Sequence, residues 1–307
     1  MRQPPGILTR RFVLIAACGV FAFVAVCNVE AAPSSSDAGK LATAILDDSR
    51  PAEIRQKEAA DDTIDAAAVI EAMTGGLEAQ SNLKEEYRRI PWIWRVAIAA
   101  GKRNREDELL RILRASLPAK GAKLRDWQAV VIGGGIINGI SLVGGWPGER
   151  LSSIVTRDED LKARWEWIQD QASTMADDPA VFKGTRYDAL RILGVGTWDR
   201  RGAQIFRYLL RGVDEELQMG AISAFSDIRS PCIGQALLSG ITFYSSRNRE
   251  MTLDALLRED SRVLELVLAV EDGRLTSAQI GEARIARMKK VRDTDVRARV
   301  EKTLGNE

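Results

Sequence analysis

The chain has 307 residues, 45% hydrophobic and 28% charged, which suits one or two domains with a buried core and is too polar for a protein that crosses a membrane many times. It contains no histidine, which excludes Ser–His and Cys–His nucleophiles, histidine metal ligands and haem attachment with an axial imidazole. The 44 basic and 43 acidic residues nearly cancel, so no nucleic-acid partner is predicted.

The amino terminus has the three parts of a secretory signal peptide. Arginines without any acid precede an apolar run from 12 to 27, and small residues then lead to Pro33. We expect residues 1–31 to be a cleaved signal peptide and 32–40 a flexible lead. The mature protein would be exported to the bacterial periplasm or outside the cell, with no stable membrane span. Cys18 completes a weak lipobox, so lipidation at Cys18 is the alternative to cleavage.

One cysteine remains after the signal peptide. Cys232 follows Pro231, and with no second cysteine it forms no internal disulfide. We expect Cys232 to be a small buried side chain at the start of a helix.

From residue 41 onward the apolar residues recur with the period of a helix. In the segment 217–228 they lie four, seven, eight and 11 positions after Leu217, and in 233–244 three, four, seven, eight and 11 positions after Ile233, which places each set on one helical face. Ser230 and Pro231 suit the cap and first turn of the second segment. Similar stripes and breaks recur about every 10 to 20 residues. The sequence predicts an all-α fold of many short amphipathic helices.

Three similar pairs indicate internal repetition: Ala189-Leu190, Ala224-Phe225 and Ala255-Leu256 follow one another at spacings of 35 and 31 residues. This is the length of a helix-pair repeat, and such pairs stack because one pair cannot bury its apolar stripe alone. We expect residues 41–307 to form a right-handed superhelix, an α-solenoid of HEAT- or armadillo-like pairs. Residues 293–305 would be a second helix of a pair, displaced by an insertion at 272–283.

The helix pairs, with Asp or Pro at the turn and Arg before Ala-Leu in the second helix, resemble HEAT-like repeats. The stretch from Leu264 to Gly305 is similar to the end of the HEAT-like module of secreted multi-domain bacterial proteins. There the module lies between a sugar-dehydrogenase-like propeller and a c-type cytochrome. LRDWQAVVIGGGIINGISLVGGWPGERL and GTRYDALRILG support this likeness over residues 40–305. The chain has no propeller and no CxxCH, so the resemblance implies a helical module that stands alone.

The run AVVIGGGIINGISLVGG imitates the strand, glycine turn and helix of a dinucleotide site. A GxGxxG motif starting at Gly133 needs glycine where Asn138 stands, and Gly139 comes one place late. The favoured interpretation is close helix packing through Gly135, Gly139 and Ser141. Binding of a flavin or nicotinamide through Gly133–Gly139 is the third hypothesis of function.

Acidic clusters at 61–62, 158–160 and 177–178 lie at predicted helix ends, so we expect them to cap helices. Tryptophans occur two apart at 92 and 94 and at 165 and 167. Because residues two apart face different sides of a helix, one of each pair is expected in the core and the other partly exposed.

Solenoids expose a concave surface lined by second helices, and this surface holds other macromolecules. We expect a non-enzymatic scaffold or protein-binding module without cofactor or metal, which partners secreted redox or glycan-processing proteins. Arg186, Tyr187 and Arg191 flank the Ala189-Leu190 pair and are expected to point outward to the partner. The alternative is an all-helical glycan hydrolase or lyase that uses carboxylates or Tyr187 as proton carriers.

Overall fold

The computed structural model describes residues 35–77 and 83–305. The expected signal peptide and Cys18 lie outside the described residues. Within these ranges every regular element is a helix and no strand occurs, which confirms the predicted all-α class.

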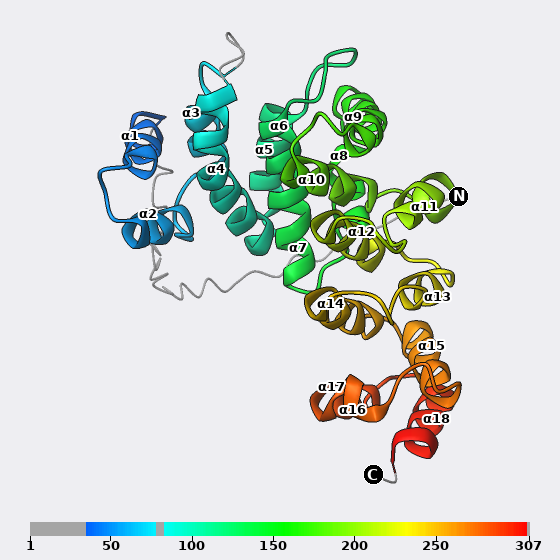
Figure 1. Ribbon diagram of the computed structural model, residues 1–307. Coiled ribbons are helices and arrows are strands. Elements are labelled where there is room, and N and C mark those ends of the chain that lie inside the picture. Colours follow the sequence, from blue (N-terminus) through cyan, green and yellow to red (C-terminus); the bar gives the residue numbers. More distant parts are fainter. Residues whose placement is uncertain (1–34, 78–82, 306–307) are drawn as a thin grey trace, which may run out of the picture. The chain divides into compact units, whose positions relative to one another are not determined.

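The helices follow one another through short turns (Figure 1). In chain order they are α1 (Ser35–Leu46), α2 (Ala52–Ala59), α3 (Ala66–Thr74), α4 (Leu83–Arg103), α5 (Glu106–Ser116), α6 (Asp126–Ala129), the π-helix η1 (Val130–Ile137), α7 (Asn138–Leu142), α8 (Pro147–Val155), α9 (Glu159–Asp177), α10 (Lys183–Leu193), α11 (Trp198–Arg207), α12 (Glu215–Asp227), α13 (Ile233–Leu238), α14 (Ser246–Leu256), α15 (Asp260–Glu271), α16 (Ser277–Ile280), α17 (Glu282–Met288) and α18 (Thr294–Leu304).

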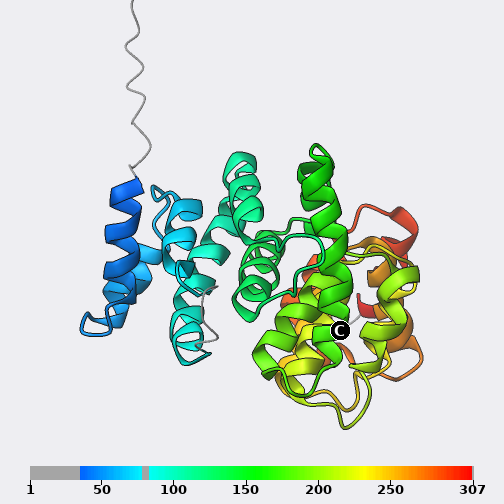
Figure 2. The same cartoon turned by 90° about the horizontal axis from the view of Figure 1, so that it is seen from above.

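The expected flexible lead is wrong for residues 35–40, because they belong to α1. Ala38, Ala42 and Ile45 recur at helical spacing and are buried, so α1 has an apolar face to cover. That face packs against α3, and α1 and α3 lie beside each other in both views (Figures 1 and 2).

The helices contact one another in two rows. In the first row α2 contacts α4, α4 contacts η1 and α7, η1 contacts α10, and α10, α12 and α14 follow in order. In the second row α1, α3, α5 and α8 follow one another, and α13, α15 and α18 do the same near the carboxyl end. Alternate helices therefore cover opposite sides of a shared core.

The carboxyl-terminal helix belongs to the second row. Arg299 of α18 forms an ion pair with Glu271 at the end of α15 (2.6 Å). Arg284 of α17 instead pairs with Asp254 of α14 (2.8 Å), which continues the first row. The expectation that 293–305 is a second helix is therefore wrong. The segment 272–283, predicted as an insertion, leads into α17. This helix follows Gly281 and takes the position after α14 in the first row.

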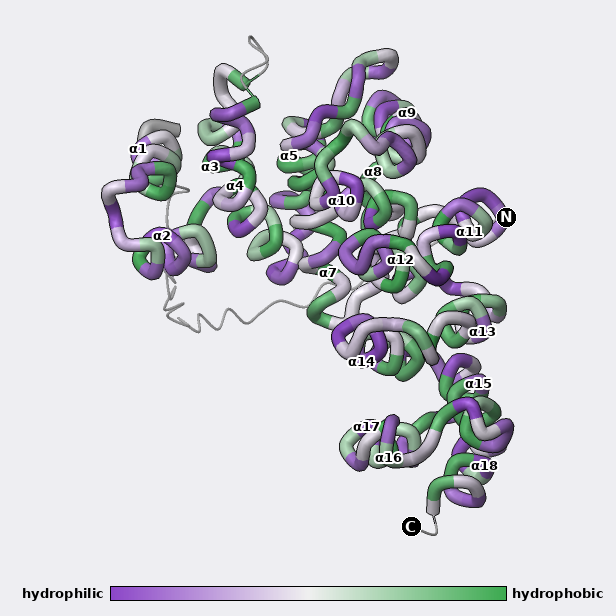
Figure 3. Tube along the Cα trace, viewed as in Figure 1, coloured by the Kyte–Doolittle hydropathy of each residue, from purple (hydrophilic) through white to green (hydrophobic). Residues whose placement is uncertain are grey.

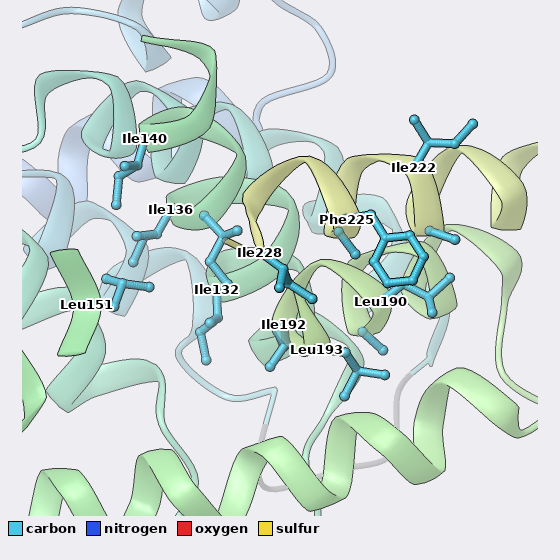
Figure 4. Packing of buried hydrophobic residues seen from close by; sticks show 14 of the residues in the cluster. Ile132, Ile136, Ile140, Leu151, Leu190, Ile192, Leu193, Ile222, Phe225 and Ile228 are labelled. Atoms are coloured by element: carbon cyan, nitrogen blue, oxygen red, sulfur yellow. The ribbon is translucent and has the colours of Figure 1, made fainter. Parts of the chain in front are cut away.

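Apolar stripes from both rows fill the core. Leu217, Ala221, Phe225 and the rest of the predicted 217–228 stripe are at most 5% exposed, and the three repeated pairs are buried as well. The helices labelled in Figure 3 carry both hydrophobic and hydrophilic residues. Side chains of η1, α10 and α12 meet in Figure 4. Burial of each large apolar side chain contributes about 1.5–3 kcal/mol relative to exposure.

The predicted stripe 233–244 is buried, but its helix α13 ends at Leu238. The chain turns at Gly240, where an added Cβ would lie 2.1 Å from the Tyr244 ring. Tyr244 therefore packs over Gly240 and reaches the core through a turn rather than a helix.

Cys232 is exposed, so the expectation that it is buried is wrong. It lies at the amino-terminal cap of α13, where its backbone N–H donates to the Ser230 hydroxyl (3.3 Å). The buried positions of this turn are taken by the next residues, Ile233 and Gly234.

Glycines set the contact between α4 and the continuous segment η1–α7. A Cβ at Gly135 would lie 2.3 Å from the Ala97 side chain, and one at Gly139 would lie 2.5 Å from the Ile98 carbonyl oxygen. The predicted close helix packing through Gly135 and Gly139 is confirmed. Residues 126–142 are helical throughout, so the strand of a dinucleotide fold is absent from this segment. Ser141 instead donates to Asp227 (2.7 Å).

Arginines from later helices satisfy free carbonyl groups at the ends of earlier ones. Arg89 donates to the Met73 carbonyl at the end of α3 (2.8 Å), and Arg164 donates to the Pro118 carbonyl after α5 (3.1 Å). Arg262 donates to the Ile228 carbonyl at the end of α12 (2.6 Å). Burial lowers the pKa of the Arg262 guanidinium to about 10. These bonds fix how successive helices stack, because helix ends leave carbonyls without partners.

In the ranges described, no single helix combines the length and hydropathy needed to span a membrane. The two helical stretches Asp126–Leu142 and Pro147–Val155 reach that length and hydropathy only when taken together, and the pair is bent by 118°.

Candidate binding groove

A groove of about 900 Å³ lies along the first row of helices. It is bounded by α4, the π-helix η1, the amino-terminal turns of α10 and α12, and the start of α14. Its lining includes Tyr87, Trp94, Phe182, Asp188, Glu216 and Arg247. Residues from these helices, together with Asn138 at the start of α7, thus face one space, and we name it the α4–α12 groove.

Aromatic rings form one side of the α4–α12 groove. The rings of Tyr87 and Phe182 are tilted against each other with centroids 4.3 Å apart, and Phe182 is 61% exposed. The Trp94 indole N–H donates to the Gly134 carbonyl (2.9 Å), which fixes the orientation of its ring. Fixed, partly exposed rings give a ligand large apolar contact at little entropic cost.

Asp188 lies on the floor of the groove. Its residue is 8% exposed, and its Oδ1 lies 2.3 Å from where a Cβ at Gly134 would stand. No side chain or backbone group among the described residues donates a hydrogen bond to this carboxyl group. Burial raises the pKa of Asp188 well above its usual value, and Glu216 raises it further, while Arg191 lowers it.

The glycine run allows α10 to reach η1. A Cβ at Gly133 would lie 2.1 Å from the Asp188 carbonyl oxygen, so only glycine lets the two backbones approach this closely. The π-helical turns of η1 lie directly beneath Asp188, and π-helical segments occur often at functional sites.

Tyr87 joins the groove to the start of α6. Its hydroxyl donates to the Asp126 carboxylate. Burial, together with Asp126, raises the pKa of Tyr87, so its phenol stays protonated and acts as a hydrogen-bond donor at neutral pH.

The remaining charges at the groove differ in their partners. Lys183 pairs with Asp214 (2.9 Å), and this bond raises the pKa of the lysine. Glu215 accepts a hydrogen bond from Ser245. Glu216 forms no ion pair with any residue in the described ranges, so a second carboxyl group stands near Asp188 without a cation of its own.

The three residues expected to face a partner have different positions. Tyr187 is half-buried and lines the groove. Arg186 is half-buried and donates to the Ala176 carbonyl at the end of α9 (2.8 Å). Arg191 is 1% exposed and pairs with the buried Asp227 (2.8 Å), so the expectation that it points outward is wrong. Its position on α10 turns it into the core between the rows.

Sequence reasoning missed Asp188 and Glu216 as groove residues. One signal for Asp188 was present: it directly precedes Ala189-Leu190, and an acid beside a predicted buried pair is unusual. Glu216 carried no such signal, because acids are common in the first turn of a helix.

The acidic clusters that the sequence singled out do stabilise turns and caps. Asp158 accepts from the Leu161 N–H (3.1 Å), Asp61 from the Thr63 N–H (2.8 Å) and Asp178 from the Ala180 N–H (2.8 Å).

The tryptophan pairs agree with expectation in part. Trp92 is buried and Trp94 half-buried, as predicted, but Trp165 and Trp167 are both half-buried. Trp167 reaches the Ala122 carbonyl with its indole N–H (2.7 Å), which keeps it against the protein.

We expect Asp188→Asn to change how stability depends on pH. A carboxyl group with a raised pKa keeps its proton in the folded chain while the unfolded chain loses it above about pH 4. Stability of the native protein therefore falls by up to about 1.4 kcal/mol per pH unit as pH rises from about 4 to the pKa of Asp188 in the folded protein. Urea unfolding of both proteins between pH 4 and 7 measures this difference.

Asp188→Asn lacks this proton, so its stability relative to the native protein should rise over the same interval. Asp62→Asn removes a carboxyl group that is 80% exposed and lies outside the groove, and it serves as the control. Parallel curves for the native protein and Asp188→Asn would contradict the burial argument.

The fold and the groove define an all-helical protein with a lined surface groove. No protein-family model, curated protein or solved structure matches the chain. In the residues that the structure describes, no cluster of three or more Cys, Asp or Glu side chains is placed to hold a metal ion.

Proposed function

We propose that this protein is a non-enzymatic scaffold, an α-solenoid of helix pairs that holds a segment of a partner protein in the α4–α12 groove. The two rows of helices support the solenoid. So do side-chain hydrogen bonds between residues 30 or 31 positions apart, the length of one helix pair. These bonds join Arg207 to Asp177, Lys183 to Asp214, Asn248 to Gln218, Arg258 to Asp227 and Arg284 to Asp254.

One observation carries the binding role. Half-buried Tyr87 and exposed Phe182 pack against each other in the same groove as the buried carboxyl group of Asp188. Aromatic anchors beside a desolvated polar group are typical of the centres of protein interfaces. The groove follows the first row of helices, the surface on which solenoids hold extended partners.

The signal-like amino terminus supports an exported protein in the periplasm or outside the cell, where partners would be secreted redox or glycan-processing proteins. Mass spectrometry of the mature amino terminus distinguishes cleavage near residue 31 from lipidation at Cys18.

Site-specific photo-cross-linking tests the scaffold. A benzoylphenylalanine at position 182 is expected to cross-link one defined protein in native cells, and Asp188→Asn should reduce the yield. The same cross-linker at Leu210, which is 48% exposed and outside the groove, is the matched control. Equal cross-linking patterns from positions 182 and 210 would contradict a partner in this groove.

Two carboxyl groups in one groove also favour a second candidate, the all-helical glycan hydrolase or lyase. Asp188, with its raised pKa, has the character of a general acid, and Glu216 has that of the accompanying carboxylate. Incubation with a panel of polysaccharides tests this candidate. Product release that is lost in both Asp188→Asn and Glu216→Gln would favour the enzyme over the scaffold.

A further inference from the structure

We infer that the α4–α12 groove binds the ammonium group of a lysine side chain on the partner segment, between the carboxyl groups of Asp188 and Glu216. This inference rests on the proposed scaffold function and names the chemistry that the groove recognises.

Two carboxyl groups at the groove have no ion-pair partner among the described residues, although Lys183 and Arg247 also line the groove. Of its four carboxyl groups, Asp214 is paired with Lys183 at 2.9 Å and Glu215 accepts from Ser245. Asp188 and Glu216 have no ion-pair partner in the described ranges. Arg191 acts on Asp188 electrostatically, but its guanidinium pairs with Asp227 at 2.8 Å.

A ligand cation would supply the missing partner of Asp188, and it would favour loss of the proton that burial keeps on this carboxyl group. The carboxyl group is nine-tenths buried and accepts no hydrogen bond from the residues described, and a buried polar group without a partner is destabilising. An ammonium group provides three donors, so it can donate to more than one carboxyl group.

The walls of the groove suit the apolar stem of lysine. Ile90, Trp94 and Met219 line it together with the Tyr87–Phe182 pair, so four methylene groups can lie on apolar surface while the charge reaches the floor. A cation beside such rings also gains from their negative faces.

The position of Asp188 favours lysine over arginine. Oδ1 lies close to Gly134, which restricts approach to this oxygen. A guanidinium binds best to two oxygens in its own plane, whereas an ammonium group is a compact point charge that needs no such pair of oxygens.

Titration with small peptides tests the inference on the full-length chain. The probe is acetyl-Gly-Gly-Lys-Gly-Gly-amide, and the matched peptides carry norleucine, Nε-acetyllysine or arginine in place of lysine. The readout is the NMR signal of the Trp94 indole N–H, assigned by comparison with Trp94→Phe. We expect the lysine peptide to shift this signal saturably and the norleucine and acetyllysine peptides to leave it in place.

Asp188→Asn and Glu216→Gln are each expected to weaken binding of the lysine peptide at least tenfold, while Asp62→Asn keeps the affinity within twofold. Glu216 is half-buried in the first turn of α12, so its variant tests the inference even where Asp188→Asn folds poorly. Equal shifts by lysine and norleucine peptides, tighter binding of the arginine peptide, or unchanged affinity in Glu216→Gln would overturn it. A partner cross-linked at position 182 without lysine binding would overturn this inference alone, whereas failure of that cross-link counts against the scaffold itself.

Discussion

Replacing Asp227 with alanine is expected to lower the free energy of unfolding by about 3–5 kcal/mol, because it leaves buried positive charge without a partner. The Asp227 side chain is 0% exposed. It pairs with Arg191, 1% exposed, at 2.8 Å and with Arg258, 15% exposed, at 2.6 Å. Ser141 also donates to Asp227 (2.7 Å). One carboxylate thus joins α10, α7 and the segment after α14 at the end of α12.

The loss should exceed that of an ordinary surface pair. Removing Asp227 does not return Arg191 to water, since its guanidinium lies between packed helices. Asp227→Asn keeps the size and one acceptor but removes the charge, so we expect an intermediate loss. The midpoints of urea unfolding of the native protein and the two variants measure the series.

Glu149→Ala is the matched control. Glu149 is 61% exposed and pairs with Arg229, 52% exposed, at 3.1 Å, and exposed pairs of this kind contribute about 0–1 kcal/mol. Added salt should weaken the Glu149 pair and leave the effect of Asp227→Ala unchanged, because buried pairs are screened less. A loss below about 1 kcal/mol in Asp227→Ala would show that Arg191 finds another partner.

The sequence allowed the helices and their buried faces to be predicted, because helical period is a local signal. The stripe from Leu217 to Ile228 was assigned correctly on spacing alone, and its residues are buried. Which helices pack against one another depends on contacts between distant segments, so it is harder to predict. The segment 293–305 has the pattern of any amphipathic helix, and only its packing on α15 shows which row it joins.

The groove itself was beyond prediction from one sequence. Asp188, Glu216 and Tyr87 lie far apart in the chain, and their meeting depends on how α4, α10 and α12 stack. The error at Arg191 has the same origin. Arginine usually faces water, but here a carboxylate 36 positions later, Asp227, is buried opposite it and draws it into the core.

The glycine run was interpreted correctly as helical packing because GxGxxG failed at Asn138. The sequence did not indicate the second structural role of these glycines, which concerns Asp188. Gly133 and Gly134 lie under Asp188, so the same run that seats η1 against α4 also shapes the floor of the groove.

Gly139→Ala is expected to destabilise the protein by about 2–3 kcal/mol, although alanine favours helices over glycine by about 1 kcal/mol. The added Cβ would lie 2.5 Å from the Ile98 carbonyl oxygen and 2.7 Å from the Gly101 Cα. Both are backbone atoms of α4, which cannot move aside as a side chain can, so the two helices must separate. Thermal and urea unfolding measure the loss.

Gly39→Ala separates this clash from helix propensity. Gly39 lies inside α1, and no atom stands within 4 Å of its Cβ position, so alanine there should raise the free energy of unfolding by about 0.5–1 kcal/mol. Gly101→Ala probes the other side of the contact, since its Cβ would lie 2.6 Å from the Ile136 carbonyl oxygen, and it should destabilise as Gly139→Ala does. Stabilisation by alanine at 101 and 139 as well as at 39 would mean that α4 and α7 do not approach through their glycines. The seating of η1 beneath Asp188 would then need another explanation.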